Sequence, residues 1–268
     1  MRIMERKKTM ILTRDNYFSK EADIEFMSVS QWKLFYECEA KALATIQGKE
    51  AATFKEAFLE GQLFEELVAG DAQTFMENHP ELVSSRGATA GQLKAEFKKV
   101  VNAAERFNSQ SFFTDIIKKC QKQVILTGEI SGVKIKCAID LFDPETNSIY
   151  DIKCMKDFKE QWNSEEKAYM PWYYVYKYVM QLAVYRELVR QNFGEPKEIG
   201  LITATKEDEP NIAALSFSSD LLDLELDNFK LYLKRYDNIK KGLLKPDSCK
   251  CCDYCKSIKI IDRFEVIK

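Results

Sequence analysis

The sequence predicts an α/β fold in which a mixed β-sheet is flanked by helices. Helical patterns occupy most of the chain before residue 123, and segments rich in β-branched residues follow between residues 123 and 154. A long helical pattern then separates these strands from a further strand and a final long helix. Strands that alternate with long helices indicate an α/β architecture rather than an all-helical or all-β one.

Length and composition are those of a folded domain with a large core. The chain has 268 residues, of which 46% are hydrophobic and 31% are charged. We expect a single domain over residues 1–268, with a core from about 28 to 245 and a cysteine-rich segment from about 246 to 268.

Charge and hydropathy limit the partners. The formal net charge is −2, so there is no overall basic field, and DNA would have to bind in a local groove. The N-terminal stretch lacks the apolar region of a secretory signal, and no apolar run approaches the roughly 20 residues of a membrane span. We therefore expect a cytoplasmic protein without a membrane partner.

The N-terminal part is expected to be helical. The stretch SVSQWKLFYECEAKALATIQG predicts one helix that is capped by Ser28 or Ser30. Residues 51–69 predict a second helix. Residues at helical spacing on one face of this second helix are Phe54, Phe58, Gly61 and Glu65.

The next segments are expected to be strands. Residues 123–143 carry Gly128 and Gly132 at turn-like positions and alternate from Val133 onward. Residues 147–154 predict a second strand. The side chains expected to point to one face of the first strand are Val133, Ile135, Cys137, Ile139 and Leu141, and those expected on the other are Lys134, Lys136, Ala138 and Asp140.

The rest of the chain alternates between helix and strand. A long helix is predicted from about 169 to 192, followed by strands around residues 199–205 and 212–217. A last helix is predicted from 219 to about 242. With the earlier strands, these elements complete a mixed sheet covered by helices.

Two acidic residues are expected to meet across a hairpin. If residues 144–147 form the turn, Asp143 faces Ser148, and the same register sets Asp140 opposite Asp151. Neighbouring carboxylates repel each other unless a positive charge lies between them. A divalent cation such as Mg²⁺ or Mn²⁺ prefers such oxygen ligands.

The spacing of these acids also allows a simpler interpretation. Asp140 can lie at a strand end, and Asp151 can be a solvated residue paired with Lys136 or Lys153. Lys153 favours a functional site, because it shares a strand face with Asp151 and places an ammonium beside the proposed cation. There it can orient a water molecule or stabilise a phosphorane.

The pattern of Asp140, Asp151 and Lys153 resembles the core of the PD-(D/E)XK nuclease superfamily. Two further elements resemble its RecB-like branch: GQLFE, which ends at Glu65, and a QxxxY pattern formed by Gln181 and Tyr185. Many relatives carry histidine where this chain has Glu65, and the neighbouring Glu66 is an alternative ligand. A carboxylate is also an adequate ligand for Mg²⁺.

The resemblance implies a restriction-endonuclease-like core and a Mg²⁺ or Mn²⁺ site. The implied metal ligands are Glu65, Asp140, Asp151 and the carbonyl of Ile152. The implied catalytic residues are Lys153, Asp140, Asp151, Gln181 and Tyr185, with Lys153 positioning the attacking water and the last two orienting the scissile phosphate.

The implied function is that of a Mg²⁺-dependent DNA exonuclease. Within the superfamily, the chain looks most like the phage-type exonucleases related to the nuclease domain of exodeoxyribonuclease VIII. The implied partners are duplex ends or single-stranded DNA and a recombinase or annealing protein, and an oligomer is compatible with the pattern. The alternatives are an inactive DNA-binding or assembly module with this fold, a helicase- or CRISPR-associated nuclease, and a structural zinc protein.

A second candidate site lies near the C-terminus. Cys249, Cys252 and Cys255 have metal-ligand spacing, and Cys251 is a possible substitute. The resemblance to iron–sulfur nucleases of the RecB-like branch implies Cys38 as the fourth ligand and a [4Fe–4S] cluster. The spacing is closer than in those families, so Zn²⁺ and unliganded thiols are the alternatives.

Aromatic residues that follow the second strand are candidates for DNA contact. Trp162, Trp172 and the tyrosines of residues 170–181 can stack on the bases of a single strand, or they can belong to the core.

Overall fold

The computed structural model describes residues 10–50, 56–261 and 264. It divides into two compact units, and each is described by itself. The first unit comprises Met1–Ala52, Thr127–Cys137 and Lys230–Lys268, and the second comprises Thr53–Leu126 and Ala138–Phe229.

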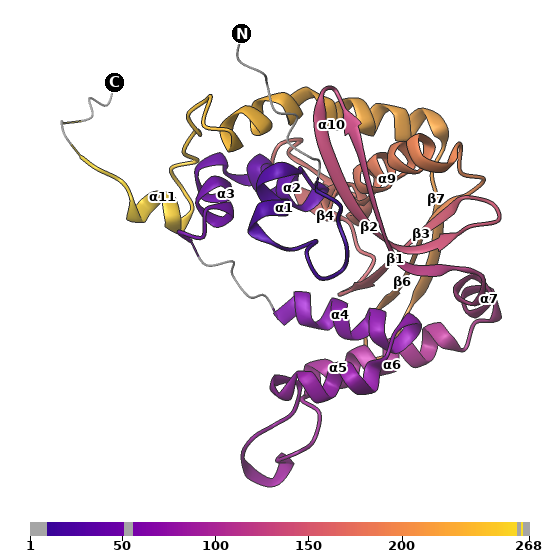
Figure 1. Cartoon of the computed structure of the whole chain (residues 1–268). Coiled ribbons are helices and arrows are strands. Elements are labelled where there is room, and N and C mark those ends of the chain that lie inside the picture. Colours follow the sequence, from indigo (N-terminus) through magenta and orange to yellow (C-terminus); the bar gives the residue numbers. More distant parts are fainter. Residues whose placement is uncertain (1–9, 51–55, 262–263, 265–268) are drawn as a thin grey trace. The chain divides into compact units, whose positions relative to one another are not determined.

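A five-stranded mixed sheet with the order β1-β2-β3-β6-β7 confirms the predicted fold class (Figure 1). The strand β3 runs parallel to β6, whereas the pairs β2–β3 and β6–β7 are antiparallel. The strands are β1 (Gln121–Ile130), β2 (Val133–Asp143), β3 (Ser148–Met155), β6 (Ile199–Thr205) and β7 (Ile212–Ser216). Gly128 lies inside β1, so the turn expected there is wrong, and the turn residues are Ser131 and Gly132.

The hairpin between β2 and β3 has the predicted register. Asp143 pairs with Ser148 and Leu141 with Tyr150, so Asp140 and Asp151 follow directly on the last pair. Asp143 stabilises the turn, because its carboxylate accepts hydrogen bonds from the Glu145 backbone and the Thr146 hydroxyl.

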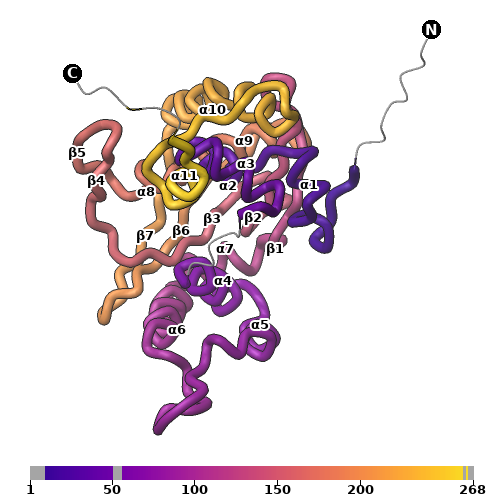
Figure 2. The backbone as a smooth tube through the Cα atoms, turned by 90° about the vertical axis from the view of Figure 1, so that its left-hand side faces the viewer, coloured from indigo at the N-terminus to yellow at the C-terminus, as the bar shows by residue number. Residues whose placement is uncertain are grey.

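The second unit contains most of the helices. Its helical elements are α4 (Glu56–Ala69), α5 (Ala72–Asn78), η1 (Pro80–Leu82), η2 (Gly87–Thr89), α6 (Ala95–Asn108), α7 (Ser111–Lys119), α8 (Trp172–Val175) and α9 (Tyr178–Phe193), and α10 (Ser219–Lys240) begins in it. A small two-stranded sheet, β4 (Gln161–Asn163) and β5 (Ala168–Met170), joins β3 to α8. In Figure 2 this hairpin lies at the left of the view, apart from α4, α5 and α6.

The second unit has a hydrophobic core in which helices pack against strands of the sheet. Phe64 of α4 and Phe107 of α6 are fully buried and meet edge to face, and they pack in one cluster with Leu141 and Ile152 of the sheet. The five alternating residues from Val133 to Leu141 are all buried, as predicted. Asp140 and the other residues between them therefore belong to the opposite face.

Two predicted helices have different limits. A long helix was expected from about 169, but α9 begins only at Tyr178, because Lys177 has a left-handed φ of 54° and the preceding residues form β5 and α8. The helix expected over 51–69 is described from Glu56, and Phe54 lies outside the described residues.

The first unit contains α1 (Lys20–Glu25), α2 (Val29–Glu37), α3 (Glu39–Ile46) and α11 (Asp253–Ser257), and α10 ends in it. One helix was expected from Ser28, but Cys38 is extended, with φ −165° and ψ 108°, and separates α2 from α3. Ser28 caps α2 as predicted, because its hydroxyl accepts from the Gln31 amide at 3.2 Å. Trp32 and Phe35 of α2 pack against Tyr236.

No helix in the described part of the chain is long and apolar enough to cross a membrane.

Candidate functional site

A largely enclosed lysine, whose side chain is 19% exposed, joins two carboxylates on β2 and β3. Lys153 Nζ lies 2.7 Å from Asp151 Oδ2 and 3.6 Å from Asp140 Oδ2. Only 2% of Asp151 is exposed, so its charge requires compensation within the protein. The strand alternation alone explains why Asp151 and Lys153 lie on one face, and the hairpin register adds Asp140.

The backbone of β3 completes this cluster. The Ile152 amide donates to Asp140 Oδ2 at 2.9 Å, and the Ile152 carbonyl accepts from Lys153 Nζ at 2.9 Å. The predicted ligand carbonyl therefore faces the same group of charges. Leu141 and Tyr150 form the last residue pair between β2 and β3. Directly beyond this pair, the Asp140 carboxylate accepts the hydrogen bond from the Ile152 backbone amide.

Helix α4 contributes the third carboxylate. Gln123 of β1 donates from one amide nitrogen to Glu65 Oε2 at 3.3 Å and to Asp140 Oδ1 at 3.2 Å. The neighbouring Glu66 instead accepts from the Asp71 backbone at 2.7 Å, near the end of α4. The geometry thus brings Glu65, rather than Glu66, to the acidic cluster.

The buried charges shift one another's pKa values. Burial is the largest cause that raises the pKa of Asp140 to about 6, and the Lys153 ammonium opposes it. Burial, followed by the charge of Asp140, raises the pKa of Glu65 well above its usual range. Burial lowers the pKa of Lys153, but Asp151 and Asp140 outweigh it and hold that pKa above its ordinary value. Lys153 therefore remains a cation at neutral pH.

Helix α9 contacts the cluster through Gln181. Gln181 Nε2 donates to Asp151 Oδ1 at 2.8 Å. Tyr185 lies one turn further along the same helix and is half-buried, with contacts of its own. The ring of Tyr178, at the start of α9, lies beneath Lys153 Nζ at 5.5 Å from its centroid. A cation above a tyrosine ring is attracted by the ring's negative face.

The donor set suits a hard divalent cation. Three carboxylates and a backbone carbonyl are oxygen ligands of the type that Mg²⁺ and Mn²⁺ prefer. Among the described residues, Asp151 Oδ2 accepts no hydrogen bond although it is buried and close to Lys153 Nζ. Its partner is the Lys153 ammonium at 2.7 Å, and an ion pair of this kind leaves lone pairs of the oxygen open to a metal ion.

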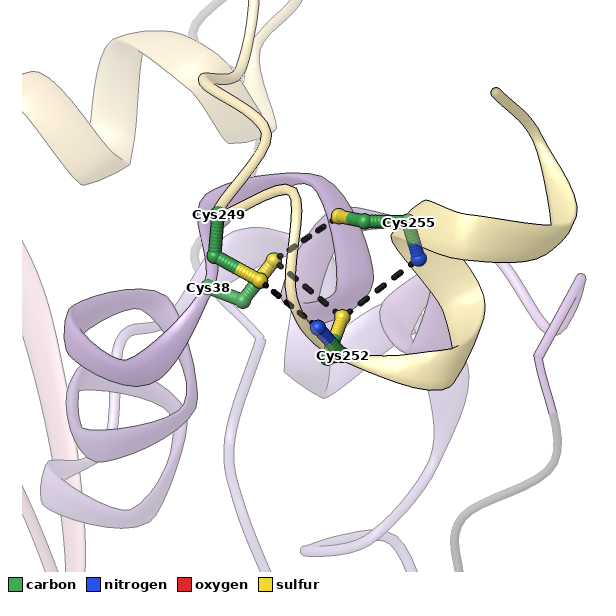
Figure 3. A group of neighbouring side chains, drawn as sticks. All are labelled: Cys38, Cys249, Cys252 and Cys255. Carbon is green, nitrogen blue, oxygen red and sulfur yellow. Dashed lines mark hydrogen bonds between the residues drawn. The ribbon is translucent and has the colours of Figure 1, made fainter.

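The four cysteines of the second predicted site also meet, within the first unit. The Sγ atoms of Cys38, Cys249, Cys252 and Cys255 all lie within 4.8 Å of one another and point toward a common centre (Figure 3). Cys251 is exposed and does not belong to this group.

Backbone amides point at the sulfur atoms of this group. The amides of Cys252, Cys255 and Lys41 donate to Cys249, Cys252 and Cys38, respectively, at 3.3 to 3.5 Å. The amide of Cys252, followed by that of Cys251, lowers the pKa of the Cys249 thiol to about 5. Such hydrogen bonds stabilise the thiolate that binds a metal ion.

Two residues near the acidic cluster were not predicted from the sequence. Gln123 and Tyr178 both contact predicted site residues. Gln123 precedes Asp140 by 17 positions on another strand and carries no charge, so no motif pointed to it. Tyr178 had a weak signal, because it is one turn before Gln181 on the predicted helix.

Comparison with known proteins shows the family to which the chain belongs. Residues 28–258 match the family model of a PDDEXK-like domain of unknown function (DUF3799). The crystal structure of a presumed exonuclease from Eubacterium rectale matches with 31% identity and a TM-score of 0.87, over 96% of this chain and 97% of that one.

A phage-related exonuclease from Haemophilus somnus also matches, with 12% identity and a TM-score of 0.32, over 58% of this chain and 77% of that one. No curated protein matches the chain.

The Lys153→Met variant tests the electrostatics of the cluster. Removal of the ammonium leaves Asp151 buried beside Asp140 without a cation, so the free energy of unfolding should fall by about 3 kcal/mol in EDTA. Mg²⁺ should restore part of this loss, because it can replace the missing positive charge. Denaturant unfolding of wild type and variant, with EDTA or Mg²⁺, measures both effects.

Lys118→Met is the matched control. Its ammonium forms an exposed ion pair with Asp115, and such pairs contribute at most about 1 kcal/mol. Equal stability losses in the two variants would contradict the description of Lys153 as the compensating charge.

Proposed function

Because the chain belongs to the family of PDDEXK-like domains, we propose that it is a metal-dependent exonuclease that hydrolyses phosphodiester bonds in DNA. The observation that carries this proposal is the buried cluster of Asp140, Asp151 and Lys153, with Glu65 held beside it. A purely structural ion pair would not need a third, half-buried carboxylate beside it. The high similarity to a presumed exonuclease supports the same activity class.

The side chains divide into metal ligands and groups that act on the substrate. Glu65, Asp140, Asp151 and the carbonyl of Ile152 would hold Mg²⁺ or Mn²⁺. Such an ion, when bound, acidifies a water molecule and neutralises charge on the phosphate. The persistent ammonium of Lys153 would position the attacking water and stabilise the negative charge that develops on the oxygens of the phosphorane.

Residues of α9 would orient the scissile phosphate. Gln181 already contacts Asp151 at 2.8 Å, and Tyr185 follows it at helical spacing. Among the residues that the structure describes, a Cβ added at Gly61, one turn before Glu65 on α4, would meet no neighbouring atom within 4 Å. Glycine within a helix costs about 1 kcal/mol relative to alanine. Since packing does not require glycine here, we infer that it leaves room for the DNA backbone.

An inactive module with the same fold is the second candidate. Such a module would be favoured if Glu65 were turned away from the two aspartates. Glu65 and Asp140 instead accept hydrogen bonds from the same amide nitrogen. This contact supports the enzyme over the module.

We also propose that the chain forms one domain and acts in DNA recombination. The strands β1 and β2 and the helix α10 each contribute residues to both compact units, which supports one nuclease domain over residues 1–268. We place its activity in the cytoplasm, in the processing of DNA ends for phage-type recombination, with a recombinase or annealing protein as its partner.

The β4–β5 hairpin is a candidate contact for an unpaired DNA strand. Trp162 and Tyr169 face each other across the two strands, with ring centroids 5.4 Å apart, and remain 54% and 66% exposed. Exposed aromatic rings are stacking surfaces for bases. Trp172, by contrast, is buried and stacks on Phe158. We therefore assign it to the core, which was the alternative to base stacking.

The spacing of the four sulfurs supports a mononuclear ion at the cysteines. A tetrahedral Zn²⁺ with bonds of about 2.3 Å separates its sulfurs by about 3.8 Å. Cys38 Sγ lies 3.4 Å from Cys255 Sγ and 3.8 Å from Cys252 Sγ. A [4Fe–4S] cluster binds each sulfur to a different iron and so needs wider separations. We therefore favour Zn²⁺ over the iron–sulfur cluster that the resemblance implied.

The Asp151→Asn variant tests the nuclease activity. It removes the most buried carboxylate while keeping its shape, so release of nucleotides from end-labelled linear duplex DNA in Mg²⁺ should fall at least a hundredfold. Asp115→Asn, which changes an exposed carboxylate on α7, should leave the rate unchanged. Full activity of Asp151→Asn would refute the proposed site, and equal cleavage of circular DNA by the wild type would refute exonuclease action.

The double variant Trp162→Ala, Tyr169→Ala tests the hairpin. Loss of one stacked base contact should weaken binding to a single-stranded oligonucleotide about tenfold. Fluorescence anisotropy in EDTA measures binding without hydrolysis. Phe112→Ala, a change of a 58% exposed aromatic on α7, should bind as the wild type does. Unchanged affinity of the double variant would exclude the hairpin as a DNA contact.

Metal analysis tests the cysteine site. Anaerobically purified protein should contain one Zn²⁺ per chain and show no absorption band in the visible range. Cys252→Ser should lose the ion, whereas Cys251→Ser should retain it because Cys251 lies outside the group. A brown protein with bound iron would support the cluster instead.

A further inference from the structure

Gln123 has an unusual backbone conformation for its position. It lies within β1, yet its φ is +52°. The other described residues with left-handed φ, apart from glycines, are Ser131, Asn147, Lys167, Lys177 and Lys250, and all of these lie outside strands and helices. A left-handed residue inside a strand interrupts the alternation of side chains and directs one of them elsewhere.

This conformation costs free energy and persists only when neighbouring interactions determine it. The interactions at Gln123 are specific. Its amide nitrogen donates both to Glu65, 58 positions earlier on α4, and to Asp140, 17 positions later on β2. Strained residues of this kind are frequent at ligand sites, where the strain fixes the direction of a side chain.

A glutamine is chemically suited to this place. Its amide is a neutral donor, so it holds two carboxylates near each other without supplying the charge that a cation would bring. A lysine here would compete with a divalent ion, and a glutamate would add to the repulsion between Glu65 and Asp140. An asparagine would be one methylene shorter than the side chain that reaches both.

We propose that Gln123 is a positioning residue of the metal site, which fixes the orientation of Glu65 toward Asp140 before the ion binds. This inference rests on the proposed function, because it assigns Glu65 and Asp140 as ligands. Gln123 holds Glu65 Oε2 and Asp140 Oδ1, while Asp151 Oδ2 is held by its ion pair with Lys153. Hydrogen-bond partners of ligating carboxylates commonly contribute ten- to a hundredfold to metal affinity.

The test is Mn²⁺ binding to the full chain, followed by electron paramagnetic resonance of the free ion. Gln123→Met keeps the length of the side chain but removes the amide, and it should lower the Mn²⁺ affinity about tenfold. Gln123→Gly also removes the amide and adopts a positive φ without strain, so it gives the same information if the methionine variant does not fold.

Two further variants serve as references. Asp151→Asn removes a proposed ligand and should lose Mn²⁺ binding at this site. Gln73→Met removes an exposed amide that donates to Glu77 at 3.1 Å on α5, and it should bind Mn²⁺ as the wild type does.

The outcomes separate the two proposals. Wild-type affinity in folded Gln123 variants, with loss of binding in Asp151→Asn, would overturn the role of Gln123 and leave the metal site intact. Tighter binding in the Gln123 variants would also overturn it, because the amide would then compete with the ion. If wild type and Asp151→Asn bind Mn²⁺ alike, the metal site itself is wrong and the role of Gln123 falls with it.

Discussion

The ion pair between Lys153 and Asp151 is the interaction on which the acidic cluster depends. Asp151 is almost fully buried and Asp140 lies beside it, so both charges would repel each other in a region of low dielectric constant. One ammonium from the same strand compensates both. The ladder between β2 and β3 ends just before these residues, and the Ile152 amide turns to the Asp140 carboxylate instead. Regular strand pairing in the hairpin therefore ends where the charged side chains begin.

The remaining parts of the cluster come from elements on either side of this hairpin. Helix α4 supplies Glu65, β1 supplies Gln123 and α9 supplies Gln181, each through a hydrogen bond to a neighbour in the cluster. Packing of α4 and α6 against the sheet gives the buried frame that holds them. Desolvation raises the pKa of Glu65 and Asp140, which means that their ionised forms are destabilised in the folded protein. A bound cation would stabilise these ionised carboxylates.

The cysteine group follows a different physical logic. Cys38 is extended between α2 and α3, and this interruption of the helix points its sulfur toward Cys249, Cys252 and Cys255 more than two hundred residues later. A metal ion there would close a very long loop, and such closure stabilises a fold by restricting its unfolded chain. Cys255 of the short α11 packs in a small buried cluster with Cys38 and Ala40.

The sequence by itself determined the five strands' approximate positions, the register of the hairpin and the shared face of Asp151 and Lys153, because alternation and turn chemistry are local. The small β4–β5 sheet and α8 were not predicted. The tertiary structure decided the rest. The late start of α9 at Tyr178 and the break at Cys38 depend on backbone conformations that overrode a continuous helical pattern. The role of Gln123 could not be predicted from the sequence, because neither its left-handed backbone nor its contact with a distant carboxylate produces a periodic pattern. Contacts between residues far apart in the chain arise only when the packed elements bring them together.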